Sequence, residues 1–303
     1  MNATPASANR NVLPERPART PAGTVRLHAP APRTVEAQAK PIVEFNGVDK
    51  SFTIPGRWPW SPKRDVHAVR NVTFTIKPGE VLALIGQSGS GKTTVSRMVL
   101  GLEEPTKGEI RLEGMRWDGL SEMQRRPQRV KYQYVPQDAL SALDPQQTAL
   151  EHVIESLTIL GKRDPTNVEG EAVKMLERLG LGHRLYALPR EMSGGEQRRV
   201  TLARVFALQP KLVVADEPTS GLDPDRQESV LEDLIHNLPP EAGCILVTHE
   251  MTQARKWCHR GLVMLEGQVI EEIQFPDGDP KHPYAKMLFD PWGQHDFAMS
   301  TAF

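Results

Sequence analysis

The stretch "LIGQSGSGKTTV" at residues 84–95 constrains the fold of this chain more than any other feature. Gly86, Gly91, Lys92 and Thr93 satisfy the spacing G-x-x-x-x-G-K-[ST] between an apolar, strand-like run and a helical segment. In that setting the backbone N–H groups of the loop and the amino terminus of the helix can converge on phosphate oxygens. A chance glycine- and serine-rich turn would not need these flanking elements, so the stretch predicts a phosphate-binding loop.

The residue types in this loop predict how a nucleotide would be held. Lys92 would bridge the terminal phosphates, and Thr93 would ligate Mg²⁺. Glycines allow the backbone to approach an anion closely. The nucleotide contacts expected in this loop and the first helical turn are Gly86, Ser88, Gly89, Ser90, Gly91, Lys92, Thr93 and Thr94.

A pair of carboxylates follows a second apolar run, "KLVVADEP" at residues 211–218. Asp216 at the strand end is expected to hold the magnesium shell, and Glu217 is the candidate general base that activates water. Because neighbouring residues of a strand point to opposite faces, the two carboxylates are expected to have different roles. Such a pair alone is more often a solvated strand end, but the apolar run and the phosphate-binding loop favour the metal site.

Apolar strand-like runs alternate with helical segments, which predicts an α/β fold of the P-loop NTPase type with a mostly parallel sheet. The alternating pattern at residues 41–54 indicates an antiparallel β subdomain, and helical spacing at about 146–192 indicates an inserted helical subdomain. The ATPase domain is expected at 41–275 and a C-terminal extension at 276–303. Residues 1–40, rich in Pro, Ala and Arg, are expected to be a disordered tail rather than a targeting peptide, because they lack an amphipathic stripe.

Composition narrows the partners. The formal net charge is −1, so no global field favours nucleic acid, and we expect no nucleic-acid partner. The two cysteines, Cys244 and Cys258, support neither a disulfide framework nor a cysteine-ligated metal centre. No apolar run approaches the roughly 20 residues of a membrane span. A cytoplasmic protein that docks onto a membrane protein is the expectation.

The segment "EMSGGEQRRVTLAR" at residues 191–204 resembles the signature motif of ATP-binding cassette (ABC) proteins. Ser193, Gly194 and Gly195 stand at the head of a helix, where glycine admits an anion and unpaired N–H groups face outward. Glu196 stands where the shortest form of the motif has Gln, and Gln197 follows one place later. Which of the two side chains fulfils the glutamine's role stays open.

The resemblance continues in the family's order over residues 42 to about 270. It implies that Gln137 is the glutamine that senses Mg²⁺ and the transport partner, that Asp223 belongs to the D-loop "SGLD", and that His249 is the switch histidine that contacts the terminal phosphate. Phe52 matches the position where the family stacks an aromatic ring on adenine, although it could equally be a core residue. The resemblance implies ATP and Mg²⁺ as cofactors.

Three further stretches resemble the peptide/nickel (oligopeptide/dipeptide) importer group of ABC proteins, particularly its second, F-type ATPase: "PGRWPWSPKRDVHAVRNVTF", "QDALSALDP" and "GDPKHPYAKML". The resemblance implies an ATPase on the cytoplasmic face of the inner membrane. Its partners would be a second ATPase subunit, identical or related, two transmembrane permease subunits and, indirectly, an extracytoplasmic solute-binding protein. The imported solute would be a peptide, nickel or a metal–chelator complex. The alternative is an ABC ATPase of a soluble phosphonate-breakdown (carbon–phosphorus lyase) complex.

Overall fold

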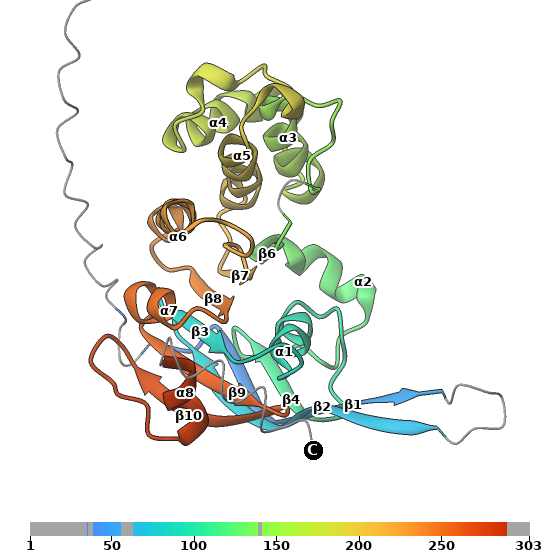
Figure 1. The fold of residues 1–303 in the computed structure, drawn as a ribbon. Coiled ribbons are helices and arrows are strands. Elements are labelled where there is room, and N and C mark those ends of the chain that lie inside the picture. Colours follow the sequence, from blue (N-terminus) through green and yellow to red (C-terminus); the bar gives the residue numbers. More distant parts are fainter. Residues whose placement is uncertain (1–34, 36–38, 56–62, 139–140, 290–303) are drawn as a thin grey trace, which may run out of the picture.

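The computed structural model describes residue 35 and residues 39–55, 63–138 and 141–289 (Figure 1). Most of the predicted tail at 1–40 lies outside the described residues. So do the middle of the loop that follows residue 55, two residues of "DALSALDP" and the last part of the C-terminal extension.

A six-stranded sheet with the order β10-β9-β3-β8-β7-β6 forms the centre of the molecule. Its strands are β3 (Val81–Ile85), β6 (Tyr132–Val135), β7 (Leu212–Asp216), β8 (Gly243–Thr248), β9 (Arg260–Leu265) and β10 (Gln268–Gln274). All neighbours pair in parallel except β10, which forms an antiparallel hairpin with β9. Every residue of β3 and β8 is buried, as the apolar runs of a parallel sheet covered on both faces predict.

A second, antiparallel sheet has the order β2-β1-β4-β5. It comprises β1 (Val43–Ile54), β2 (Arg64–Ile76), β4 (Lys107–Leu112) and β5 (Met115–Arg116). Buried and exposed residues alternate at the end of β2, where Val72, Phe74 and Ile76 point inward. The rings of Phe45 and Phe74 stack across the strand pair with their centroids 4.6 Å apart. The predicted antiparallel subdomain is therefore present.

Helices α3, α4 and α5 pack against one another at one end of the molecule, and α5 also contacts β6 (Figure 1). The helices are α1 (Lys92–Val99), α2 (Glu122–Arg125), α3 (Ala149–Glu155), α4 (Pro165–Arg178), α5 (Gly194–Ala207), α6 (Pro224–Asn237), α7 (Met251–Trp257) and α8 (Pro283–Phe289). Short turns of 3-10 or π type span Arg126–Lys131, Ser156–Leu160, Gly182–Arg184 and Pro189–Glu191. Within the described residues, no helix combines the length and apolarity needed to cross a membrane.

The central sheet separates two hydrophobic cores. Val81, Ala83 and Ile85 of β3 point into a core shared with α3 to α8, whereas Leu82 and Leu84 of the same strand point into a core shared with α1 and the antiparallel sheet. Because successive side chains of a strand alternate between faces, one apolar run supplies both cores. The strand is thereby fixed in register from both sides.

The Phe45–Phe74 stack generates a prediction about stability. Phe45→Ala should lower the free energy of unfolding by about 3–5 kcal/mol, because Phe45 is fully buried and its removal leaves a cavity. Chemical denaturation of the two proteins measures the difference. Met123→Ala is the control, since Met123 is 85% exposed and its truncation should change stability by less than about 0.5 kcal/mol. Equal effects of the two substitutions would contradict the assigned core.

Candidate functional site

The parallel strands end at the same edge of the central sheet. Ile85 pairs with Thr248, and Asp216 pairs with Val247. The residues that follow these strand ends are therefore brought together although they are far apart in the sequence. They comprise the phosphate-binding loop, Glu217 and His249, and this edge is where ligands bind in open α/β sheets.

The glycines of the phosphate-binding loop allow it to lie directly against neighbouring backbone. Gly86 has φ 154° and Gly91 has φ 105°. A Cβ atom on Gly86 would lie 2.4 Å from the carbonyl oxygen of Met264, and one on Gly91 would lie 2.5 Å from that of Ala68. The backbone N–H of Gly267 also donates to the carbonyl of Ser90 over 3.0 Å. The loop is thus held against β2 and the β9–β10 turn by its own chain.

Lys92 lies beneath the loop and is only 5% exposed. Its Nζ donates to the backbone carbonyls of Gly86 over 2.7 Å and Gln87 over 2.9 Å. Burial lowers the pKa of Lys92, and the nearby charges of Glu217 and Asp216 act in the opposite direction. A buried ammonium beside a loop of backbone donors is suited to receive phosphate oxygens.

Helix α1 begins without a side-chain cap, since Gly91 at its start makes no capping hydrogen bond. Its first N–H groups therefore remain available for an anion. Thr93 and Thr94 lie in this first turn, while Ser88, Gly89 and Ser90 lie in the loop itself. The hydroxyl of Ser90 is buried and makes no hydrogen bond within the described part of the chain. These groups fit a bound nucleotide.

Asp216 is half-buried at the end of β7, and the hydroxyl of Tyr134 on β6 donates to its Oδ2 over 3.4 Å. Burial raises the pKa of Asp216, and the adjacent charge of Glu217 adds to this rise. A divalent cation at this carboxylate would favour its ionised form. The oxygen donors of Thr93 and Asp216 suit Mg²⁺, which prefers carboxylate and hydroxyl ligands together with substrate phosphates.

Glu217 has a backbone φ of 45°, a conformation that residues other than glycine rarely adopt. Its N–H donates to the carbonyl of Val247 over 3.0 Å, which fixes the backbone against β8. The Nδ1 of His249 lies 3.6 Å from its carboxylate Oε2. Backbone strain of this kind is found where the surrounding structure holds a functional side chain in place.

Gln137 reaches the same group through Ser220. Its Nε2 donates to the Ser220 hydroxyl over 3.0 Å, and the N–H of Ser220 donates to the carbonyl of Glu217 over 3.0 Å. The structure therefore brings Gln137, Ser220, Glu217 and His249 into one connected set. Ser220, which the sequence analysis names only within the D-loop motif, links Gln137 to Glu217, and His249 contacts Glu217 directly.

The signature residues open α5 in a capping box. The hydroxyl of Ser193 accepts from the N–H of Glu196 over 3.3 Å, and the Glu196 carboxylate accepts from the N–H of Ser193 over 2.7 Å. Arg184 Nε also donates to Glu196 over 2.9 Å. These bonds, that from the Ser193 backbone first, lower the pKa of Glu196 to about 2. Gln197 instead donates from Nε2 to the carbonyls of Pro189 and Met192, so both side chains are engaged within the chain.

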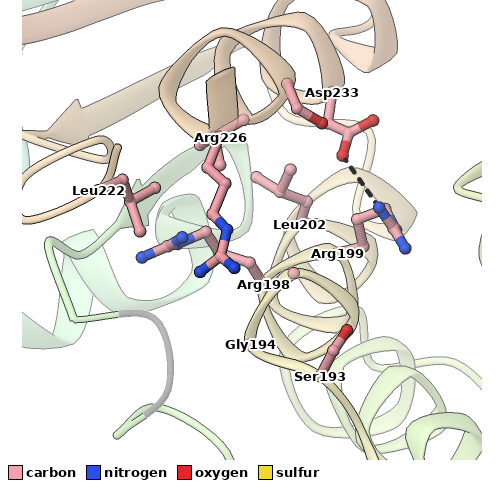
Figure 2. A pocket seen from close by; sticks show the side chains of 11 residues that line it. Ser193, Gly194, Arg198, Arg199, Leu202, Leu222, Arg226 and Asp233 are labelled. Carbon is pink, nitrogen blue, oxygen red and sulfur yellow. Dashed lines mark ion pairs between the residues drawn. The ribbon is translucent and has the colours of Figure 1, made fainter. Parts of the chain in front are cut away.

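Gly194 and Gly195 differ from the glycines of the phosphate-binding loop. A Cβ atom on either would meet nothing within 4 Å in the described part of the chain. Beside them lies a cavity of 420 Å³ between α5 and α6. Figure 2 shows Arg198 from α5 and Arg226 from α6 entering this space, while Arg199 pairs with Asp233 over 3.7 Å. The α5 end therefore presents an open, cationic surface.

Two predicted contacts are engaged with other groups in this structure. Phe52 is half-buried on β1, and Nζ of Lys50 lies 4.8 Å from its ring centroid. The Asp223 carboxylate caps α6 by accepting from the N–H of Arg226 over 3.2 Å, and it pairs with the Arg226 guanidinium. Their roles toward nucleotide stay predictions.

The comparison with known proteins gives the family. The family model described as ABC transporter matches residues 69–220, which is half of the chain. This chain belongs to the ABC transporter family. The predicted fold class and family are confirmed.

The curated relatives are longer proteins. The chain is 35% identical over 256 residues to the glutathione import ATP-binding protein GsiA of Salmonella paratyphi A, covering 83% of this chain and 41% of that protein. Identity to GsiA of Escherichia coli K12 is 34% over 275 residues, covering 87% of this chain and 44% of that protein. The chain thus spans less than half the length of these relatives.

Solved structures agree in fold. The dimeric structure of MJ0796, a bacterial ABC transporter cassette, is 28% identical with a TM-score of 0.65, covering 77% of this chain and 99% of that one. The structure of cbiO1 from Clostridium perfringens, part of the ABC transporter complex cbiONQ, is 26% identical with a TM-score of 0.66, covering 77% of this chain and 88% of that one.

Two tyrosines at the candidate site were not predicted from the sequence. Tyr134 bonds Asp216, and Tyr284 on α8 accepts a hydrogen bond from the backbone N–H of Gln87 in the phosphate-binding loop. Tyr134 stands in "YQYV", a short strand just before Gln137, and its role comes from the pairing of this strand with β7. Tyr284 lies in "KHPY", and no spacing rule connects that stretch to the loop.

The capping box of α5 generates a prediction with a pH dependence. Glu196→Gln keeps an oxygen acceptor for Ser193 but removes the charge that faces Arg184, so it should destabilise the chain at pH 7. A carboxyl with a depressed folded pKa stabilises the fold above its ordinary pKa of 4.5, and this stabilisation is lost as the pH falls toward 2. The measurement is urea denaturation of the parent chain and of Glu196→Gln at pH 7, 4.5 and 3. The difference between their free energies of unfolding should become smaller only below pH 4.5.

Glu169→Gln, on the exposed side of α4, is the control for this series. It should change the free energy of unfolding by less than about 0.5 kcal/mol at each pH. A difference between Glu196→Gln and the parent chain that stays constant from pH 7 to pH 3 would contradict the lowered pKa of Glu196.

Proposed function

We propose that this chain is the ATP-binding and ATP-hydrolysing subunit of an ABC importer, working with Mg²⁺ at the cytoplasmic face of the membrane. The observation that carries the proposal is the meeting of Lys92, Asp216, Glu217 and His249 at one edge of the sheet, with Lys92 buried beneath a loop of backbone donors. Nucleotide hydrolysis needs a phosphate-binding lysine and loop, a carboxylate that can hold a metal ion, and a general base, all at one place.

Each residue has a role in the proposed reaction. Lys92 and the first N–H groups of α1 bind the terminal phosphates, and Thr93 with Asp216 holds Mg²⁺, which neutralises charge on the phosphates. Glu217 accepts the proton of the attacking water, while His249, 3.6 Å from its carboxylate, stabilises the transferring phosphoryl group. Gln137 is connected to the site by its hydrogen bond to Ser220, and it reports the state of the site to the transport partner.

A second cassette, identical or related, would complete each site. The head of α5 lies in the helical part of the molecule, separate from α1 (Figure 1). Since Gly194 and Gly195 have open space before them, an outside phosphate can approach their N–H groups. The MJ0796 cassette, which is 28% identical, is described as a dimer in a post-hydrolysis state bound to ADP and Pi. Two ATP molecules between two chains would match this arrangement.

The proposed solute is based on the names of the curated relatives. GsiA is named as a glutathione import ATP-binding protein, and glutathione is a small peptide. We therefore place small peptides first, ahead of nickel or metal–chelator complexes, and assign two permease subunits and an extracytoplasmic solute-binding protein as the further partners. A soluble lyase complex of phosphonate breakdown is the other class of partner that the same ATPase core could serve.

The first prediction of this proposal concerns Glu217. Glu217→Gln should leave the Kd for ATP within about threefold and lower kcat by about 100-fold or more, because only the group that takes the proton from water is altered. ATP binding by the purified chain and phosphate release by the assembled complex measure the two effects. Lys92→Ala is the matched comparison and should weaken binding itself. Normal turnover of the Glu217→Gln complex would exclude Glu217 as the base.

A second prediction concerns assembly. The chain alone should hydrolyse ATP slowly, and its turnover should rise far more than its affinity when a second cassette and the permease supply the missing phosphate donors. Phosphate release is measured for the chain alone, for the paired ATPases and for the membrane complex with its solute-binding protein. Full turnover by a monomer would refute the shared site. Stimulation by a lyase complex instead would refute the importer and leave the ATPase assignment standing.

A further inference from the structure

One peptide group of the phosphate-binding loop is held from both sides. Its carbonyl, on Gly86, accepts a hydrogen bond from Nζ of Lys92 over 2.7 Å, and its N–H, on Gln87, donates to the hydroxyl of Tyr284 over 3.0 Å. Because a peptide bond is planar, these two bonds fix the orientation of the whole Gly86–Gln87 unit. Tyr284 belongs to α8, 197 residues further along the chain.

Tyr284 is itself firmly placed. Its side chain is 3% exposed and belongs to the same core as β3 and α7, together with Ala285 and Leu288 of its own helix. The approach to α8 is fastened to β10, because the Glu271 carboxylate accepts from the backbone N–H groups of Lys281 over 2.7 Å and His282 over 2.9 Å. The hydroxyl of Tyr284 is thus delivered to the loop by rigid elements, not by a mobile side chain.

We infer that Tyr284 is a positioning residue for the nucleotide, which holds the Gly86–Gln87 peptide so that the following N–H groups face the phosphates. The inference deepens the proposed function and rests on it only for the identity of the ligand. It gives the "KHPY" stretch a role at the ATP site of this same chain. No contact between Tyr284 and the nucleotide is required.

The two partners of the peptide group respond differently when phosphate arrives. Lys92 makes its bonds to Gly86 and Gln87 in this structure, and the proposed function turns the same ammonium toward the phosphates. The hydrogen bond from Lys92 to the carbonyl of Gly86 then weakens. Tyr284 is not one of the phosphate-binding groups in the proposed function, so its hydrogen bond to the N–H of Gln87 can persist through binding and release. A loop that stays in its binding geometry loses less conformational freedom when the ligand binds.

Tyr284→Phe tests this role because it removes one oxygen and keeps the buried ring. The Kd of the purified chain for ATP, measured with Mg²⁺ by calorimetry, should rise about three- to tenfold, the effect of one lost hydrogen bond. In the assembled complex, KM should rise by the same factor while kcat stays within about twofold, since the loop binds ground state and transition state alike. The backbone amide of Gln87 should exchange its hydrogen faster.

Two further variants serve as a control and as a second test. Tyr186→Phe is the control, because Tyr186 is 74% exposed in the helical part and should leave the Kd unchanged. Glu271→Ala removes the acceptor of the Lys281 and His282 N–H groups and should also raise the Kd for ATP. This variant keeps the inference testable if Tyr284→Phe does not fold. An unchanged Kd in both Tyr284→Phe and Glu271→Ala would overturn the inference.

A purely structural role is a separate outcome, and it would also overturn the inference. In that case the free energy of unfolding of Tyr284→Phe falls while the Kd for ATP and the exchange of the Gln87 amide stay at their parent values. The failure of the proposed function is distinguished from both results, because the parent chain itself would then bind no ATP in the same calorimetric measurement.

Discussion

The parallel pairing of β3 with β8 and of β8 with β7 is the constraint on which the rest of the structure depends. Strands buried on both faces need mostly apolar residues, so polar side chains stand at their last residues or beyond them, as Asp216 and Thr248 do. Because the strands run in one direction and in register, those ends form one edge. The phosphate-binding loop, Glu217 and His249 are neighbours for this reason, and no local feature of any one of them determines it.

The same arrangement places charges where water is scarce. Burial shifts the pKa of Lys92 down and that of Asp216 up, so desolvation works against the charged form of each, and their mutual attraction only partly offsets it. A site that holds a buried ammonium and a half-buried carboxylate without full compensation is suited to a ligand that brings both kinds of charge. A nucleotide with its divalent cation would supply phosphate oxygens for Lys92 and a metal for Asp216.

Local sequence patterns were sufficient for the core elements and for the motif residues. The apolar runs predicted β3, β7 and β8, and the loop between β3 and α1 followed from glycine spacing. Residues 107–135 hold β4, β5 and β6, which the pattern did not predict. These strands are short and mixed in character, and pairing with β1 and β7 stabilises them. Tyr134 and Tyr284 were not predicted for a related reason, since each acquires its role from a tertiary contact with another segment.

The two helix ends that we propose to bind phosphate differ in what surrounds their glycines. At Gly86 and Gly91 the chain's own backbone fills the space that a side chain would need, and α8 and the β9–β10 turn hold the loop from behind. At Gly194 and Gly195 nothing of the described chain does so, yet the end of α5 is already rigid, because Glu196 and Ser193 satisfy each other. Rigidity without an internal neighbour is what a surface needs to meet a phosphate held elsewhere. This difference supports the proposal that the loop at residues 86–92 holds a nucleotide, and that the head of α5 closes over a nucleotide presented by another chain.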